Sequence, residues 1–172
     1  MTKLTPMRGE EFVKRILDGE REFSNIELEK GFNLSGYEGF NELQNYLKNY
    51  DLRENPVIIN NSDFSYVRAD GLYLPYVQGI RAKFEKAYLR EADLWGASLM
   101  KAYLKGAYLL GANLKGANLV KANLEEADLE GAKLEGANLK HVVGLKNVLQ
   151  DETFLKTIAR KIKKYLSWEK ME

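Results

Sequence analysis

The sequence contains no cysteine, and histidine occurs once, at His141. Without cysteine the chain cannot form disulfides, thiolate metal sites or a cysteine nucleophile. A single histidine with no cluster of ligands around it is typical of a surface or capping residue. We therefore expect no metal site and no catalytic site built on these residue types.

Long apolar runs and an excess of one charge are also missing. No apolar run is long enough to cross a bilayer, and the first residues, MTKLTPMRGEEF, lack the apolar core of a signal peptide. The 26 basic and 25 acidic side chains leave a net charge of +1. Such a balance provides no overall field to attract nucleic acid or an anionic membrane. We expect a cytoplasmic protein without a membrane span, for which nucleic acid is not the favoured partner.

Alanine and leucine recur with a period of five residues. Alanine stands at positions 82, 87, 92, 97, 102, 107, 112, 117, 122, 127, 132 and 137. Two residues after each alanine comes Phe84 and then, without exception, a leucine from Leu89 to Leu139. A weaker version of the pattern runs upstream in the same phase from Val57. Repeats of this regularity indicate a solenoid rather than a globular core.

Neither regular secondary structure can use a period of five while it is continuous. Five residues turn an α-helix by about 500°, so successive leucines would spread around its axis. In a straight strand, an odd period sends successive leucines to opposite faces. A short extended piece followed by a bend satisfies the pattern, because alanine and leucine then share one face. Glycine suits such a bend, and it occupies the fifth place at Gly96, Gly106, Gly111, Gly116, Gly131 and Gly136.

Repeats such as ANLKG, ANLVK and ADLEG resemble the pentapeptide-repeat family, whose motif is A(D/N)LXX. The resemblance covers Val57 to about Lys146. It implies an all-β solenoid, a right-handed quadrilateral parallel β-helix with four pentapeptides per square coil and short flanking α-helices. The seventeen repeats from Val57 to His141 would then form just over four coils, a rod about 20 Å long at roughly 4.8 Å per layer.

The flanking segments divide the chain further. Residues 1–22 contain a predicted helix whose apolar face is Phe12, Val13, Ile16 and Leu17, with Gly19 as its stop. Residues 23–35 form a first partial coil, in which the five-residue frame breaks before Leu34. In residues 36–50, Phe40, Leu43, Leu47 and Tyr50 have helical spacing. Ser35 and Glu38 are predicted to form a capping box for this helical insertion.

The repeat domain then spans 51–146, and 147–172 are predicted to form a C-terminal helix. Its apolar residues lie on one face, with Lys156, Lys163 and Lys164 opposite. The simplest interpretation is a helix that caps the open end of the solenoid. Two alternatives are a helix that forms a homodimer and a basic amphipathic helix on a membrane surface.

The outward places of the repeats carry no catalytic or cofactor motif. Metal-ligand spacings, a P-loop and a dinucleotide fingerprint are all missing. The carboxylates of EEADLEGAKLEG fall at solvated outward places, and the glycines are bend residues rather than a phosphate cradle. We therefore predict a non-enzymatic protein with no catalytic residues, no cofactor and no metal.

Apolar and aromatic outward residues concentrate in the first half of the repeats, and charged ones in the second half. If residues twenty apart stack, these side chains form a candidate interaction face. The candidates are Tyr73, Ile80, Tyr88, Trp95, Met100, Tyr103, Tyr108 and Leu110. An alternative is that the helical insertion at 36–50 folds back and covers part of this patch, including Trp95 and Met100.

Two functions are weighed on this basis. The favoured one is a non-catalytic scaffold that binds another protein through a face of the solenoid. The alternative comes from the resemblance, since some pentapeptide-repeat proteins imitate duplex DNA and inhibit or protect type II topoisomerases such as DNA gyrase. Imitation of DNA needs a strongly negative rod, whereas residues 57–141 hold 11 basic and 10 acidic side chains. This near-neutral balance disfavours the alternative.

Overall fold

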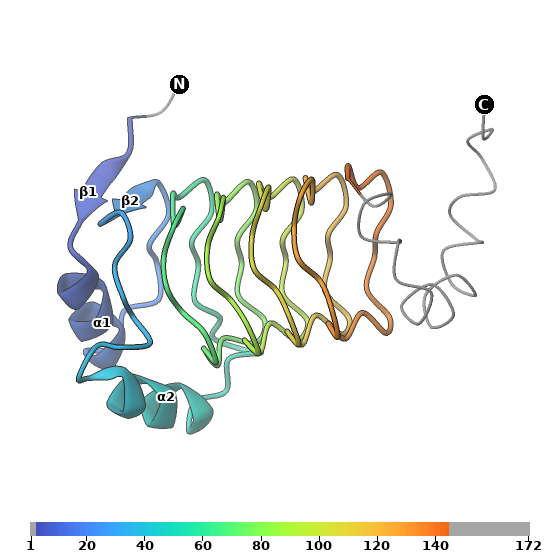
Figure 1. The fold of residues 1–172 in the computed structure, drawn as a ribbon. Coiled ribbons are helices and arrows are strands. Elements are labelled where there is room, and N and C mark those ends of the chain that lie inside the picture. Colours follow the sequence, from blue (N-terminus) through green and yellow to red (C-terminus); the bar gives the residue numbers. More distant parts are fainter. Residues whose placement is uncertain (1–2, 145–172) are drawn as a thin grey trace, which may run out of the picture.

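The computed structural model describes residues 3–144 (Figure 1). Its helices and strands all lie near the N-terminus: β1 (Thr5–Met7), α1 (Gly9–Leu17), β2 (Ile26–Leu28) and α2 (Phe40–Lys48). Beyond α2 the chain winds into a regular solenoid of stacked coils. The C-terminal helix predicted at 147–172, with its capping or dimer-forming role, lies outside the described residues.

Each coil of the solenoid contains twenty residues, because every fifth residue bridges in parallel to the residue twenty positions further on. One such column runs through Ile58, Gln78, Ser98, Asn118 and Asn138. Main-chain hydrogen bonds join the layers: Asn113 N–H donates to the Ala92 carbonyl at 2.9 Å, and Leu94 N–H donates to the Asn113 carbonyl at 2.8 Å. Four pentapeptides therefore make one turn of a parallel β-helix, as the resemblance to the pentapeptide-repeat family implies.

Each side of the coil ends in a tight turn at the fifth residue of the repeat. This residue has a positive φ in all seventeen repeats from Asn61 to His141. The amide after it closes the turn, as where Ala97 N–H donates to the Leu94 carbonyl at 3.1 Å. Positive φ at the third residue and a bond from the fourth residue to the first define a type II turn. The predicted glycine bends are confirmed, and they share this conformation with non-glycine residues such as Lys101 and Glu126.

The alanine and leucine side chains fill the interior of the coils. Every alanine of the strict repeats from Ala82 to Ala122 is fully buried, and so are the leucines from Leu109 to Leu124. The upstream repeats bury Val57, Val67, Leu72 and Val77 at the place of the alanine. Burial of the leucines supplies the hydrophobic free energy, about 1.5–3 kcal/mol for each side chain.

The aspartate or asparagine between alanine and leucine has a separate structural task. Its side-chain oxygen accepts a hydrogen bond from the backbone N–H two residues later, as Asn123 does from Glu125 at 2.9 Å and Asp93 does from Trp95 at 3.1 Å. This is an Asx turn, a conformation in which a short polar side chain replaces a main-chain acceptor. The (D/N) of the motif therefore helps to form the corner.

Helix α1 covers the N-terminal end of the solenoid (Figure 1). Phe12, Val13 and Ile16 on its inner face are buried. The Phe12 ring packs edge-on against Phe23 at 4.8 Å and Phe64 at 5.3 Å between ring centroids. Strand β1 pairs in parallel with β2 and adds one strand to the same end. The open core of the first coil is thereby closed by α1.

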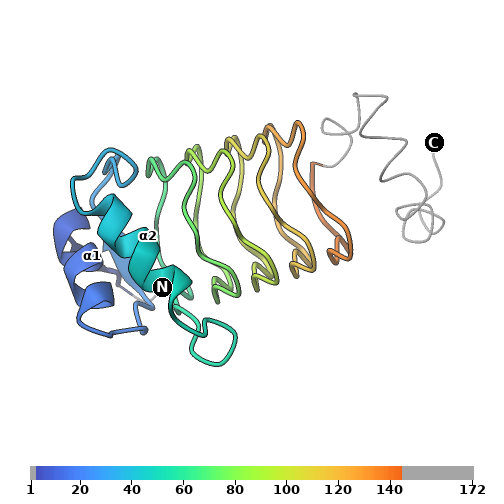
Figure 2. The ribbon, with the colours of Figure 1, turned by 90° about the horizontal axis from the view of Figure 1, so that it is seen from below.

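Helix α2 takes the place of one side of the first coil (Figure 2). Three sides of that coil are formed by residues that bridge to Ile58, Asp63 and Arg68. At the fourth side, Tyr73 N–H donates to the buried Gln44 side-chain oxygen at 2.7 Å. In the next layer the corresponding amide, Asp93 N–H, donates to the backbone carbonyl of Leu72. Gln44 therefore provides the acceptor that a fourth strand would have offered.

The capping box predicted for α2 is wrong. The helix begins at Phe40, its N-cap is Gly39, and no side chain caps it. The Ser35 hydroxyl instead contacts Asn33 and the carbonyl of Arg68, because Ser35 still belongs to the first coil. The pattern Ser35–Glu38 lies one turn too early to reach the free amides of the helix.

Neither described helix has the length or the apolar character that a membrane span requires.

Candidate interaction surfaces

The solenoid presents four faces, each named by the order of its first repeat. Face 1 holds residues 57–61, 77–81, 97–101, 117–121 and 137–141; face 2 holds 62–66, 82–86, 102–106 and 122–126; face 3 holds 67–71, 87–91, 107–111 and 127–131; face 4 holds 72–76, 92–96, 112–116 and 132–136. The residue before the leucine lies at the centre of a face, and the two residues after the leucine lie at its following edge. Faces 1 and 3 are on opposite sides of the rod.

The eight predicted interface residues are distributed over all four faces. Ile80 and Met100 lie on face 1, Tyr103 on face 2, Tyr88, Tyr108 and Leu110 on face 3, and Tyr73 and Trp95 on face 4. Trp95, Tyr103 and Leu110 are the most exposed, at 48%, 46% and 36%. The structure therefore brings three of the eight together on face 3, and Ile80 and Met100 together on face 1.

The alternative prediction was that the helical insertion at 36–50 covers part of the eight interface residues. Helix α2 covers fewer of them than that prediction supposed. Tyr73 is half-buried against the core, and its backbone is bonded to Gln44 of α2. Trp95, one coil further along the rod, keeps about half of its surface exposed. Its ring packs against Tyr76, with 5.0 Å between the ring centroids. The helix therefore binds the backbone of Tyr73 and leaves Trp95 on the free surface.

Face 3 carries a stack of two tyrosines bordered by arginines. The rings of Tyr88 and Tyr108 lie 4.6 Å apart and are inclined by 17°. The Arg90 guanidinium lies 5.6 Å from the Tyr88 ring centroid and 5.2 Å from that of Tyr108, and Arg68 lies 5.4 Å from Tyr88. A cation at this distance from an aromatic face is attracted to the ring quadrupole. We call Arg68, Tyr88, Arg90, Tyr108 and Leu110 the tyrosine–arginine patch.

Ion pairs between neighbouring layers occupy face 2. Lys83 Nζ lies 3.1 Å from Asp63 Oδ2, and Lys105 Nζ lies 3.5 Å from Glu125 and 3.3 Å from Glu126. The hydrogen bond to Asp63 raises the pKa of Lys83. Burial opposes ionisation of Asp63, but the hydrogen bonds from Ser65 and Lys83 outweigh it and lower its pKa. Pairs of this kind are solvated and contribute little to stability.

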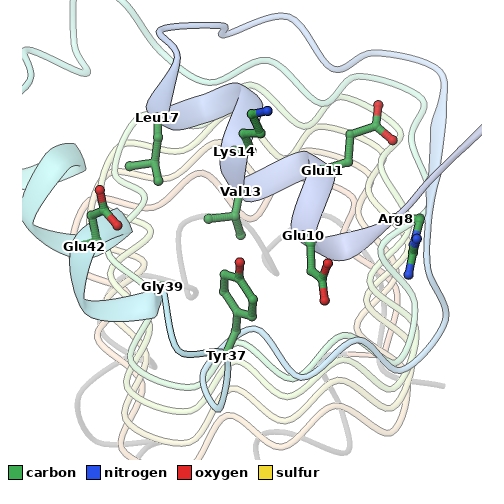
Figure 3. Close-up of a pocket in the computed structure, with 9 residues that line it drawn as sticks. All are labelled: Arg8, Glu10, Glu11, Val13, Lys14, Leu17, Tyr37, Gly39 and Glu42. Atoms are coloured by element: carbon green, nitrogen blue, oxygen red, sulfur yellow. The ribbon is translucent and has the colours of Figure 1, made fainter.

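A groove of about 460 Å³ lies at the N-terminal end of the rod (Figure 3). It runs between α1 and the segment that leads into α2, and Val13, Leu17 and Tyr37 form its apolar part. Its charged rim mixes both signs, with Glu10 and Lys14 from α1 and Glu42 from α2. Mixed charges in an open groove select no particular ligand. In residues 3–144 there is also no group of three or more carboxylates or histidines that could hold a metal ion.

The model of the pentapeptide-repeat family matches residues 80–114 and 107–143, with eight copies of its repeat. These are the residues in which the Asx turns, the positive-φ corners and the buried alanine and leucine columns are most regular. Residues 80–143 therefore consist of repeats of the pentapeptide-repeat family. Among curated proteins, none matches the sequence.

Three solved structures are similar to this chain, and two of them are structures of pentapeptide-repeat proteins. Full-length QnrB1, a plasmid-mediated fluoroquinolone resistance protein, is 18% identical over 70% of this chain and 57% of its own, with a TM-score of 0.50. Rfr23 from the cyanobacterium Cyanothece 51142 is 27% identical over 76% of this chain and 95% of its own, with a TM-score of 0.47. The protein alr5209 from Nostoc Pcc 7120 is 26% identical over 53% and 87%, with a TM-score of 0.46.

The likeness to full-length QnrB1, together with the match to the family model, establishes the predicted right-handed quadrilateral β-helix. This chain spans 57% of full-length QnrB1 and 44% of a trypsin-treated form of it. At such coverage and identity the comparison concerns the fold of the coils. The surfaces of the present chain have to be interpreted from its own residues.

Proposed function

We propose that this protein is a non-catalytic scaffold that binds another protein through the tyrosine–arginine patch of face 3. The observation that carries the proposal is the Tyr88–Tyr108 stack with Arg90 beside both rings. Tyrosine, tryptophan and arginine dominate the residues that contribute most to binding at protein interfaces. Here two tyrosines and two arginines gather on one side of a rigid rod.

The geometry of the patch keeps the entropic cost of binding low. Tyr88 and Tyr108 are half-buried and hold each other in place, so that little side-chain freedom remains to be lost. Arg68 and Arg90 are exposed and can bond to carbonyl or carboxylate groups of a partner. Leu110 adds exposed apolar surface next to the stack. A preformed aromatic centre with polar groups at its border is the usual anatomy of a protein interface.

Affinity capture from cells that express the protein naturally tests this proposal. The triple substitution Tyr88→Ala, Arg90→Ala, Tyr108→Ala is expected to lower the amount of bound partner by about tenfold or more. The matched control changes central residues of the opposite face: Gln78→Ala, Ser98→Ala, Asn118→Ala. It should leave the amount unchanged, as measured by quantitative mass spectrometry on preparations with equal circular dichroism. Equal loss in both variants, or in neither, would remove face 3 as the binding surface.

Imitation of duplex DNA toward a type II topoisomerase is the second candidate. In its favour, Glu125, Glu126, Asp128, Glu130 and Glu135 concentrate acidic side chains in the last coils. Against it, two of these carboxylates are paired with Lys105, and Glu135 is paired with Lys115. A supercoiling assay with DNA gyrase separates the two candidates. We expect no inhibition or protection at micromolar protein, and a clear effect would favour DNA imitation over the scaffold.

A further inference from the structure

The charges of the repeats are nearly balanced in total, but they are not distributed evenly around the rod. At the edge where face 1 turns into face 2, each coil contributes the two residues that follow the buried side chain. The charged ones are Arg81, Lys101, Lys121 and Lys140, and no carboxylate lies in any repeat of face 1. In the part of the chain described here, the other three edges each carry both signs. We call the residues 80–81, 100–101, 120–121 and 140–141 the basic edge.

The cations of the basic edge contrast with three lysines elsewhere on the solenoid that have acidic partners. Lys83, Lys105 and Lys115 each form an ion pair with the layer next to them. Within residues 3–144, no carboxylate lies within ion-pair distance of the four cations of the basic edge. Like charges that face each other across neighbouring strands destabilise a sheet. A stack of Arg81, Lys101 and Lys121 on consecutive layers therefore has a cost that the structure does not offset internally.

An apolar column runs beside the charged one. The residues directly before the cations are Ile80, Met100 and Val120, and all three are half-buried. Where the two columns meet, Asn60, Asn61, Ile80, Arg81, Met100 and Lys101 line a shallow depression of about 260 Å³. The exposed Tyr103 follows on face 2 in the same coil as Lys101. The basic edge is thus amphipathic along its length, with an apolar floor and a row of positive charges.

We infer that the basic edge is a docking surface for an acidic amphipathic helix of another protein. The cations repeat once per coil, at about 4.8 Å. One turn of an α-helix advances by about 5.4 Å, so a helix with a carboxylate on each turn presents anions at nearly the same interval. Over the two steps from Arg81 to Lys121 the mismatch is about 1 Å, which flexible lysine and arginine side chains absorb. Apolar residues next to these carboxylates would contact Ile80, Met100 and Val120.

Other occupants fit the basic edge less well. A nucleic acid would offer phosphates but no apolar stripe for the column beside the cations, and four cations supply few phosphate contacts. The chain's own residues 145–172 contain 7 basic and 4 acidic side chains, so they share the sign of the edge. A second copy could contribute its acidic last coils, but Glu125, Glu126 and Glu135 already have lysine partners. Charge complementarity therefore favours a separate, acidic chain.

Fluorescence anisotropy with synthetic probes tests this inference on the full chain. The probe is a labelled helical peptide of about four turns with glutamate every three to four residues beside a leucine stripe. We expect saturable binding that weakens by about tenfold or more in the variant Arg81→Glu, Lys101→Glu, Lys121→Glu. Raising the salt concentration should weaken binding to the unaltered chain as well, because exposed charges are screened.

Three comparisons decide the result. The control variant Lys86→Glu, Lys115→Glu, Lys133→Glu changes the net charge equally on faces 2 and 4, and it should keep binding within about twofold. If the control variant weakens peptide binding equally, net charge alone explains the effect and the inference is overturned. Equal binding of a peptide with the same composition in scrambled order would overturn the helical match. Tighter binding of a DNA duplex that depends on the same three residues would replace the acidic helix with nucleic acid.

The further inference is independent of the proposed role of face 3. Its variants leave Tyr88, Arg90 and Tyr108 unchanged, and face 2 separates the basic edge from that patch. Capture through face 3 could therefore fail while the peptide still binds the basic edge, and the reverse holds equally. Sedimentation of the unaltered chain and of the variant Arg81→Glu, Lys101→Glu, Lys121→Glu at the same concentrations reveals whether a second copy binds the basic edge. A shift from dimer to monomer would overturn the inference in favour of self-association.

Discussion

Replacing Phe12 with alanine is expected to lower the free energy of unfolding of the N-terminal end by about 3–5 kcal/mol. The ring is almost completely buried, at 4% exposure, and lies between Phe23 and Phe64. Truncation removes the contacts of α1 with two successive coils and leaves a cavity that the rigid coil cannot close. Loss of α1 would also expose the apolar interior of the first coil to water.

The effect of Phe12→Ala should remain local, because each coil of a solenoid contacts only its neighbours. Hydrogen exchange followed by mass spectrometry measures this directly. The amides of Thr5 and Phe23, which bond to Asn25 and Ile58, should lose protection. The amide of Asn113, which bonds to Ala92, should keep it. Uniform loss of protection along the rod would contradict the local picture.

A matched control for Phe12→Ala is available on the surface. Trp95→Ala removes an even larger ring, but 48% of Trp95 is exposed and the ring packs only beside Tyr76. Trp95→Ala should lower the free energy of unfolding by about 0.5–1.5 kcal/mol, the value typical of one aromatic pair. If Phe12→Ala lowers the free energy of unfolding no more than Trp95→Ala does, then α1 contributes little to closing the core.

The interior of the coils could be predicted from the sequence, because it depends on a short period alone. Alanine and leucine two residues apart must share a face, and a bend every five residues keeps them inside. The corners were only partly predictable. Glycine marks them at Gly96 and Gly116, but Lys101 and Glu126 adopt the same positive φ without any signal in their own residue type. There the stacked turns above and below determine the conformation.

The N-terminal region was harder to predict because side chains replace main-chain partners there. Gln44 in α2 offers its amide oxygen to Tyr73 where a strand would offer a carbonyl. No periodic pattern in the sequence predicts that a side chain takes the place of a main-chain acceptor. The capping box at Ser35 failed for a related reason, since Ser35 remains bonded through its backbone and hydroxyl to Arg68 of the next coil. Local motifs compete with long-range pairing, and here the pairing prevailed.

The outward surfaces follow from the sequence once the length of a coil is known. Comparing residues twenty apart at the place after the leucine gives the column Ile80, Met100 and Val120. The same comparison one residue later gives Arg81, Lys101 and Lys121, the charged column of the basic edge. A count of charges over the whole repeat domain hides this column, because opposite charges elsewhere cancel it. The near-neutral total therefore argues against imitation of DNA but says little about individual edges.

Replacing Gly79 with leucine is expected to destabilise the protein by about 1–3 kcal/mol or more, although leucine is the consensus residue at this place. Gly79 is buried in the repeat VQGIR, where the strict repeats have their leucine. A Cβ atom at Gly79 would already lie 3.1 Å from Leu99 Cδ2 and 3.5 Å from Ile59 Cγ1. The side chains of the layers above and below have filled the space, so three further carbon atoms have no room.

Thermal and urea unfolding of three related variants separates overpacking from backbone effects. Gly79→Ala should stay within about 1 kcal/mol of the parent, because reduced freedom of the unfolded chain offsets one tight contact. Leu99→Ala alone should cost about 2–5 kcal/mol by leaving a cavity. In the double variant Gly79→Leu, Leu99→Ala the new leucine can occupy that cavity, so the total cost should be smaller than the sum of the single costs. Additive costs, or a more stable Gly79→Leu variant, would show that the consensus rather than the local packing governs this coil.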